Sequence, residues 1–132
     1  MKVLSLTEPW AYLIKSKKKH IETRSWKTNY RGELYIHASL TKIPKYALNN
    51  KELMKLVILD EILYGYIICK CNIVDCIYMT DEFINKLKKD NYQEYICGDY
   101  KVGRYAWILS DIEILDHPIK AKGHLGIWNY DI

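Results

Sequence analysis

The stretch "LSLTEPWAYLIKSKKKHIETRSWKTNYRGELYIHAS", residues 4–39, contains most of the local information about the fold. Apolar and polar side chains alternate over 2–7, 20–26 and 33–39, and this period of two predicts three β-strands. Between the first two, "WAYLI" places apolar residues at the i, i+3 and i+4 positions of one helix face. We therefore expect strand, short helix, strand, turn and strand, with Thr7 as the helix N-cap.

A run of lysines ends the expected helix and leads into the second strand. Cations are favourable at a helix C-terminus, where the last carbonyl groups carry partial negative charge. This effect accounts for Lys17 and Lys18 without any ligand. Lys19 stands at the junction itself, from which its side chain can reach back toward Glu22.

Glu22 and Arg24 are two residues apart on the expected strand, so their side chains share one face. A solvated ion pair is one explanation, and such pairs contribute little to stability. Trp26 lies on the same face, however, and Lys19 lies next to it. The four side chains combine a cation or base, a carboxylate, a guanidinium fork and a flat aromatic wall, which together predict a binding surface.

Length and composition are those of a soluble globular protein. The chain has 132 residues, 49% hydrophobic and 27% charged, which fits a single domain over 1–132 with a buried core. No apolar run reaches the roughly 20 residues of a membrane helix, and the N-terminus does not resemble a signal peptide. Phosphate-loop, H-E-x-x-H and G-x-S-x-G motifs are absent. We expect a cytoplasmic monomer without a metal, a cofactor or a membrane partner.

Positive charge is concentrated in the first part of the sequence. Residues 1–50 carry ten Lys and Arg against three acids, a balance of +7, whereas residues 51–132 have a balance of −3. This polarity indicates an anionic partner for the first part. Three of the twenty basic residues are arginines, namely Arg24, Arg31 and Arg104. We expect each of them to be needed for its planar guanidinium group, whose fork of N–H donors lysine lacks.

The remaining sequence completes a mixed pattern of strands and short helices. Long apolar strands with helices at the margins predict a small barrel-like α+β fold. The cysteine spacing does not match a zinc knuckle, so core packing is expected of Cys69, Cys71, Cys76 and Cys97. The further elements are one or two helices over 43–63, a long central strand over 64–79, a helix over 80–90 capped by Thr80 or Asp81, a loop over 91–103, a strand over 104–115 and a short strand pair or turn in the tail.

The polar face of the second strand suits a nucleobase. Aromatic faces stack on bases, arginine binds phosphate or a base edge, and a carboxylate accepts from an exocyclic amine. Lys17 and Lys18 would then hold the backbone of the nucleic acid. If the strand over 33–39 pairs with that over 20–26, Tyr35, His37 and Ser39 add to the same surface. His37 also has a structural explanation as a hydrogen-bonded residue, and we expect Trp10 and Trp107 in the core.

At these residues the sequence resembles the activating signal cointegrator homology (ASCH) domain family. The matching pattern is "S-L-x-x-P-W-A", then a lysine before "x-I-E-x-R-S-W-x-T-x-Y-R-G-x-L-x-I-H-A-S", with looser matches over 65–83 and in "YAWILSDIEIL". The resemblance covers nearly the whole chain. It implies a PUA-like small β-barrel of mixed strands flanked by short helices, with a role in binding RNA or DNA. Together with the basic first part and the polar face of the second strand, it leads us to expect RNA or single-stranded nucleic acid as the ligand. The matching motif positions are Pro9, Trp10, Lys19, Glu22, Arg24, Trp26, Tyr30, Arg31 and His37.

The resemblance also implies an alternative in which the domain is an enzyme. Some small bacterial relatives are amidohydrolases that cleave N4-acetylcytidine with a Lys, a Thr and a Glu, and others are ribonucleases. Lys19 matches the lysine, but Glu22 stands at the position of the threonine; Thr23 faces the other side of the strand, and Glu94 is a guess for the glutamate. Lys19 and Glu22 are thus the catalytic candidates if the domain acts on a nucleoside or RNA. A protein-interaction domain is the third hypothesis.

Overall fold

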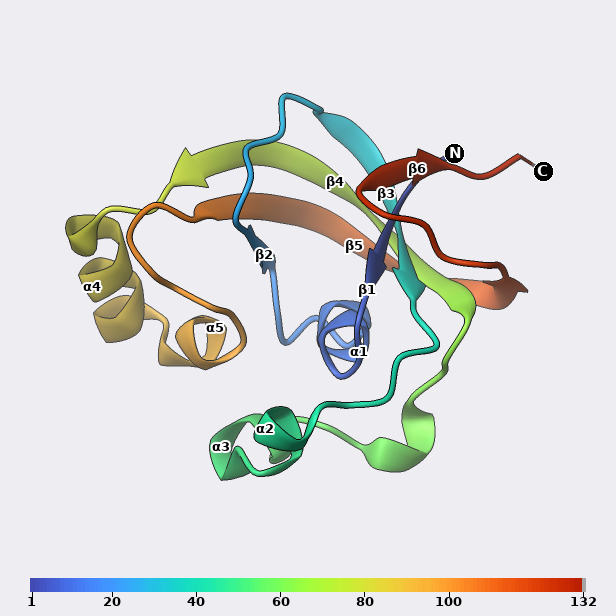
Figure 1. Ribbon diagram of the computed structural model, residues 1–132, viewed down its shortest axis with the longest axis horizontal. Helices are drawn as coiled ribbons and strands as arrows, with labels where there is room; N and C mark the ends of the chain where they lie inside the picture. Colours follow the sequence, from blue (N-terminus) through green and yellow to red (C-terminus); the bar gives the residue numbers. More distant parts are fainter. Residues whose placement is uncertain (132) are drawn as a thin grey trace.

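The computed structural model describes residues 1–131, and its centre is one curled sheet of six strands (Figure 1). The strand order across the sheet is β2-β5-β4-β3-β1-β6. The long strands β4 and β5 arch over the other elements, so the sheet closes into a half-barrel (Figure 1). The strands are β1 (Lys2–Leu6), β2 (Ile21–Arg24), β3 (Gly32–Ala38), β4 (Tyr66–Tyr78), β5 (Tyr105–Lys120) and β6 (Ile127–Asn129).

Strand pairing in this sheet is mixed. β1 runs parallel to β3, and the other strand pairs of residues 1–131 are antiparallel. β4 lies between β3 and β5, which confirms the expected central position of its apolar sequence. The β4–β5 ladder shifts register three times, and such bulges increase the local twist and bend that a curled sheet needs.

Short helices flank the sheet, which confirms the expected α+β architecture. α1, α2 and α3 lie below the concave side in Figure 1, and α4 and α5 lie to one side, beyond β2. No helix of residues 1–131 is long and apolar enough to cross a membrane. The helices are α1 (Trp10–Lys15), α2 (Lys45–Leu48), α3 (Lys51–Met54), the 3₁₀ turn η1 (Leu59–Glu61), α4 (Asp81–Asp90) and α5 (Tyr92–Ile96).

Two of the local expectations at helix ends are wrong. The segment over 91–103 is not all loop, because Asn91 caps α5 by accepting a hydrogen bond from the Glu94 amide at 3.2 Å. Thr7 does not cap α1, which begins after Pro9 without a side-chain cap. Thr80 does cap α4, as predicted, and accepts from the Phe83 amide at 3.1 Å.

The pairing considered between the strands over 20–26 and 33–39 does not occur. β2 pairs with β5, with Glu22 opposite Trp107, whereas β3 lies between β1 and β4. Alternation shows which side chains share a face of a strand, but it does not specify which neighbour forms hydrogen bonds with that strand. Tyr35, His37 and Ser39 therefore do not extend the polar face of β2.

The core fills the concave side of the half-barrel. Its centre is Trp107, which is fully buried, and α1 covers it with Ala11 and Ile14. Cys69, Cys71 and Cys97 are buried among apolar side chains, while Cys76 is partly exposed and packs against the same core. This agrees with the expectation that the cysteines serve in packing.

Burial also predicts the reactivity of the thiols. It raises the pKa of Cys71 to about 12 and that of Cys97 to about 11, and it raises the pKa of Cys69 even further. Titration of the native protein with a soluble disulfide reagent should therefore show one fast thiol, and the Cys76→Ser variant should lose that phase. Two or more fast thiols in the native protein would contradict the burial described here.

Candidate nucleic-acid interface

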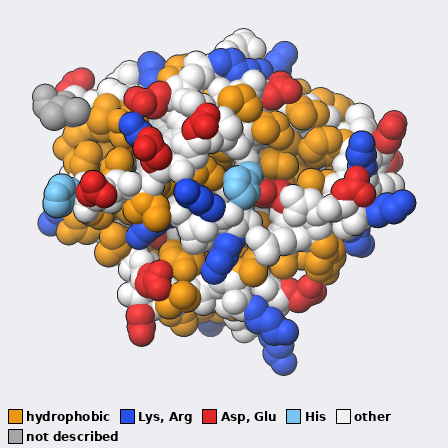
Figure 2. Space-filling view, turned by 180° about the vertical axis from the view of Figure 1, so that it is seen from behind, with side chains coloured by type: hydrophobic (Ala, Val, Ile, Leu, Met, Phe, Trp, Pro, Cys, Tyr) orange, Lys and Arg blue, Asp and Glu red, His pale blue; other side chains and the backbone are white. Residues whose placement is uncertain are grey.

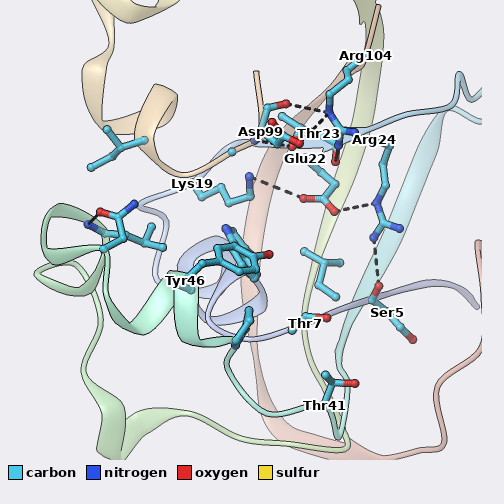
Figure 3. A pocket seen from close by; sticks show the side chains of 18 of the residues that line it. Ser5, Thr7, Lys19, Glu22, Thr23, Arg24, Thr41, Tyr46, Asp99 and Arg104 are labelled. Carbon is cyan, nitrogen blue, oxygen red and sulfur yellow. Dashed lines mark hydrogen bonds and ion pairs between the residues drawn. The ribbon is translucent and has the colours of Figure 1, made fainter. Parts of the chain in front are cut away.

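A cleft of about 860 Å³ opens between the strand β2, the end of β1 and the short helices (Figure 3). This volume is near the upper end of the roughly 300–1,000 Å³ typical of ligand pockets. The edge strands of the sheet are β2 and β6, and β6 pairs only with residues 2–4 of β1, so the half-barrel is open between β2 and the end of β1. Segments far apart in the sequence line it, from Ser5 in β1 to Arg104 just before β5.

A chain of charged side chains forms the back wall of this cleft (Figure 3). Lys19 is fully buried, and its ammonium lies 3.7 Å from Oε1 of Glu22. Oε2 of Glu22 accepts a hydrogen bond from Nε of Arg24 at 2.9 Å. Arg24 in turn donates from Nη2 to the Ser5 carbonyl at 3.2 Å. This Lys19–Glu22–Arg24 chain therefore connects β2 to β1 across the open side of the half-barrel.

The outer edge of β2 is closed by charged side chains instead of another strand. The Lys19 ammonium donates to the carbonyl of Ile21, and Nη2 of Arg104 donates to that of Thr23 at 3.3 Å. The buried Glu94 carboxylate accepts from the amide of Ile21 at 3.2 Å. An edge strand whose backbone groups are satisfied in this way is protected from pairing with other chains.

Two aromatic rings stand at the entrance, and neither is the tryptophan that the sequence indicated. Trp10 at the start of α1 and Tyr46 in α2 both line the cleft, with ring centroids 6.1 Å apart and planes tilted by 35°. Trp10 is only partly buried, which corrects the expectation that it belongs wholly to the core. Tyr46 is 72% exposed, so its ring is available to a ligand.

Positive side chains outnumber negative ones around the cleft. Lys19, Arg24, Lys42 and Arg104 face Glu22 and Asp99, a net charge of +2 among the lining residues. Lys42 is exposed near the mouth, whereas Arg104 is held by the Asp99 carbonyl at 2.9 Å. The cleft thus has an aromatic side, a basic mouth and one deep carboxylate.

The model of the ASCH domain family matches residues 4–116 of the chain. The chain belongs to the ASCH-domain family. The match includes the whole charged back wall of the cleft, and the curled mixed sheet with short flanking helices agrees with the PUA-like fold that the resemblance implied. Among curated proteins no significant match to this ASCH domain was found.

Of the site residues predicted from sequence, three line the cleft of this ASCH domain, namely Lys19, Glu22 and Arg24. Trp26 lies beyond the end of β2, where its ring packs edge-on against Trp107 with centroids 4.6 Å apart. Its carbonyl accepts from the Trp107 indole at 3.3 Å, so Trp26 closes the end of the core and is not a wall of the cleft.

The predicted residues of the turn before β3 also lie outside the cleft lining. The Tyr30 hydroxyl donates to the Glu33 carbonyl at 2.5 Å, and the Arg31 guanidinium donates to the Thr28 and Tyr30 carbonyls at 3.1 and 2.9 Å. These contacts explain why the motif has this composition, since its polar side chains hold the turn in shape.

His37 occupies a different place again, on the far side of β1. Its Nδ1 lies 2.9 Å from the Ser5 hydroxyl and its Nε2 lies 2.7 Å from the Ala121 carbonyl. Burial lowers the pKa of His37, so the ring is neutral near pH 7. This agrees with the structural explanation for His37.

The two other predicted lysines differ from each other. Lys17 is exposed and has a left-handed backbone conformation, with φ of 63°, where the chain turns out of α1. Lys18 donates to the Leu56 carbonyl at 2.7 Å and thereby ties α1 to the segment after α3. Neither lines the cleft.

The contacts of Lys19 also bear on the enzyme hypothesis. Its ammonium has three N–H donors, and three acceptors surround it: the carbonyls of Ile21 and Cys97, the latter at 2.9 Å, and the Glu22 carboxylate. Lys19 is thus engaged in structural contacts, and it ties the helix–strand junction to the segment after α5.

Two further residues considered for the enzyme hypothesis, Thr23 and Glu94, are also engaged in structural contacts. Thr23 lines the cleft, although we expected it to face away, but its hydroxyl accepts from the Asp99 amide at 3.1 Å. Glu94 lies outside the cleft lining and accepts from the amides of His20 and Ile21. Within residues 1–131 no group of three His, Cys, Asp or Glu side chains is placed to hold a metal ion.

Sequence reasoning missed the part of the cleft that comes from the helical insertion after β3 and from the loop before β5. Tyr46, Lys42 and Asn50 lie in or beside helices whose exposed faces show no pattern that distinguishes them from ordinary solvated residues. Arg104 did carry a signal, because it is one of three arginines among twenty basic residues.

Proposed function

We propose that this ASCH domain binds single-stranded nucleic acid, RNA foremost, through the cleft. One observation supports this above the others: the aromatic pair of Trp10 and Tyr46 lines the same cleft as a buried carboxylate, Glu22, set between the Lys19 ammonium and the Arg24 guanidinium. An aromatic ring can stack on any base, and a carboxylate beside arginines can hydrogen-bond the edge of that base.

Phosphates would be held at the mouth of the cleft, where Lys42 and Arg104 lie. A continuous basic track is not evident on the face turned away in Figure 1: Figure 2 shows lysine and arginine side chains interspersed with acidic ones there. We expect binding to depend on the cleft and to involve few phosphate contacts. The logarithm of the association constant should then fall only shallowly with the logarithm of the salt concentration, with a slope of about −0.7 per phosphate.

Replacing Tyr46 by alanine should weaken binding of a short single-stranded RNA by roughly 5- to 150-fold, because one base–aromatic stack is lost. Tyr46 is 72% exposed, so the variant should fold like the parent protein. Fluorescence anisotropy with a labelled U-rich RNA nonamer at low salt measures the change.

The matched control is Tyr64→Ala, which removes a partly exposed tyrosine that does not line the cleft. This control should bind as the parent protein does. Equal affinities of the Tyr46→Ala protein and the parent would exclude the cleft as the site. Absence of any binding to single-stranded RNA or DNA at low salt would contradict the proposed function itself and favour a protein partner.

A further inference from the structure

Glu22 retains hydrogen-bonding capacity on both of its oxygen atoms. A carboxylate offers about four lone-pair positions. One position of Oε2 is taken by Nε of Arg24 at 2.9 Å, and the Lys19 ammonium approaches Oε1 only to 3.7 Å, which is longer than a hydrogen bond. Each oxygen can therefore accept one further hydrogen bond from a ligand in the cleft.

The groups around Glu22 differ in what they can donate. Lys19 donates hydrogen bonds to the carbonyls of Ile21 and Cys97, and its side chain is fully buried, so we assign it no hydrogen bond to the ligand. Arg24 and Arg104 each have five N–H donors. Within residues 1–131, Arg24 donates two hydrogen bonds and so does Arg104, which leaves three N–H groups on each.

A ligand thus meets two adjacent acceptors, the oxygens of Glu22, with guanidinium donors next to them (Figure 3). Among the four RNA bases, guanine alone presents two adjacent donors, N1–H and N2–H, beside a carbonyl acceptor, O6. In adenine and cytosine the amine lies next to a ring nitrogen whose lone pair would face the second carboxylate oxygen. In uracil the single N–H lies between two carbonyl oxygens, one of which would face the carboxylate.

We infer that the cleft selects guanine, with N1–H and N2–H donating to Glu22 and O6 accepting from an arginine, while the ring lies toward Trp10 and Tyr46. This inference rests on the proposed function and narrows it to one base. The rigid setting of the carboxylate supports selectivity, because Lys19 and Arg24 hold it from both sides and a wrong base leaves buried polar groups unpaired.

The test is a series of U-rich RNA nonamers whose central base is guanine, inosine, adenine, cytosine or uracil, measured by anisotropy at low salt with the parent protein. Guanine should bind most tightly, by about 5- to 150-fold over adenine, cytosine and uracil. Inosine keeps N1–H and O6 but lacks the N2 amine, so its affinity should fall at least about fivefold below that of guanine.

Glu22→Gln should reduce the guanine preference to less than about twofold, because an amide offers one acceptor instead of two. Tyr46→Ala should weaken all five RNAs by a similar factor and keep their order. Since the base series uses the parent protein, the inference can be tested even if the Glu22→Gln protein fails to fold.

Each outcome decides between the two proposals. Measurable binding with equal affinity for all five RNAs, or a preference for another base, would overturn the guanine assignment and leave the proposed function standing. Equal binding of guanine and inosine would also overturn the assignment, because the N2 amine would have no partner. Absence of binding to all five would overturn both.

Discussion

Replacing Lys19 by methionine is expected to lower the free energy of unfolding by about 3–5 kcal/mol, the usual cost of removing one partner of a buried ion pair. The carbonyls of Ile21 and Cys97 lose their donor, and Glu22 loses one of its two cationic neighbours. Methionine has a similar volume, so little of the change comes from a cavity. Urea denaturation at pH 7 measures it as a shift in midpoint.

Lys27→Met is the matched control, since Lys27 is exposed and its substitution should change stability by less than about 0.5 kcal/mol. The double variant Lys19→Met, Glu22→Gln should recover part of the loss, because the carboxylate left without its lysine is then neutral. A loss below about 1 kcal/mol for Lys19→Met would show that the ammonium does not hold the helix–strand junction together.

The second large effect concerns Glu8, whose carboxylate is fully buried at the start of α1. Oε1 accepts from the Tyr12 amide at 2.8 Å, and Oε2 has no hydrogen-bond partner within residues 1–131. Burial raises the pKa of Glu8 from 4.5 to about 7. The folded protein therefore binds this proton more tightly than the unfolded chain does.

The direction of the pH effect follows from that difference in pKa. Between pH 4.5 and about 7 the folded state holds more protons than the unfolded state, so the contribution of Glu8 to the free energy of unfolding falls as pH rises. Above pH 7 the ionised carboxylate costs about 3 kcal/mol. Glu8→Gln should therefore match the parent protein near pH 4.5 and exceed its stability by up to about 3 kcal/mol at pH 8.

Denaturation of both proteins across pH 4.5–8 tests this. The difference between them isolates Glu8, because His37, whose lowered pKa acts in the opposite direction, contributes equally to both. A constant gap between the Glu8→Gln and parent proteins at all pH values would contradict the raised pKa.

Much of the fold follows from local patterns. The long apolar run of β4, the alternation of β1 and β3 and the cap of α4 at Thr80 are all encoded within a few residues. α5 escaped prediction because its five residues are too few for a helical period to appear, and its cap at Asn91 follows α4 directly.

The candidate site also contains residues that the sequence predicted and residues that it did not. Lys19, Glu22 and Arg24 could be predicted as one group because they are neighbours in sequence and the strand period places two of them on one face. Tyr46 and Arg104 follow Glu22 by 24 and 82 residues in the sequence. Only the packing of α2, and of the loop that leads into β5, brings them to the cleft. Trp26 had the right sequence pattern but lies against Trp107, beyond the strand end.

The sequence by itself determined the order of the strands and of the helices other than α5, the family, and the grouping of Lys19, Glu22 and Arg24 at the helix–strand junction, because these depend on spacing along the chain. Only the tertiary structure decided that β2 pairs with β5 and not with β3, and that the half-barrel stays open between β1 and β2. Strand partners are chosen by the packing of the whole core, to which every alternating strand presents a similar apolar face. The cleft is a consequence of that choice.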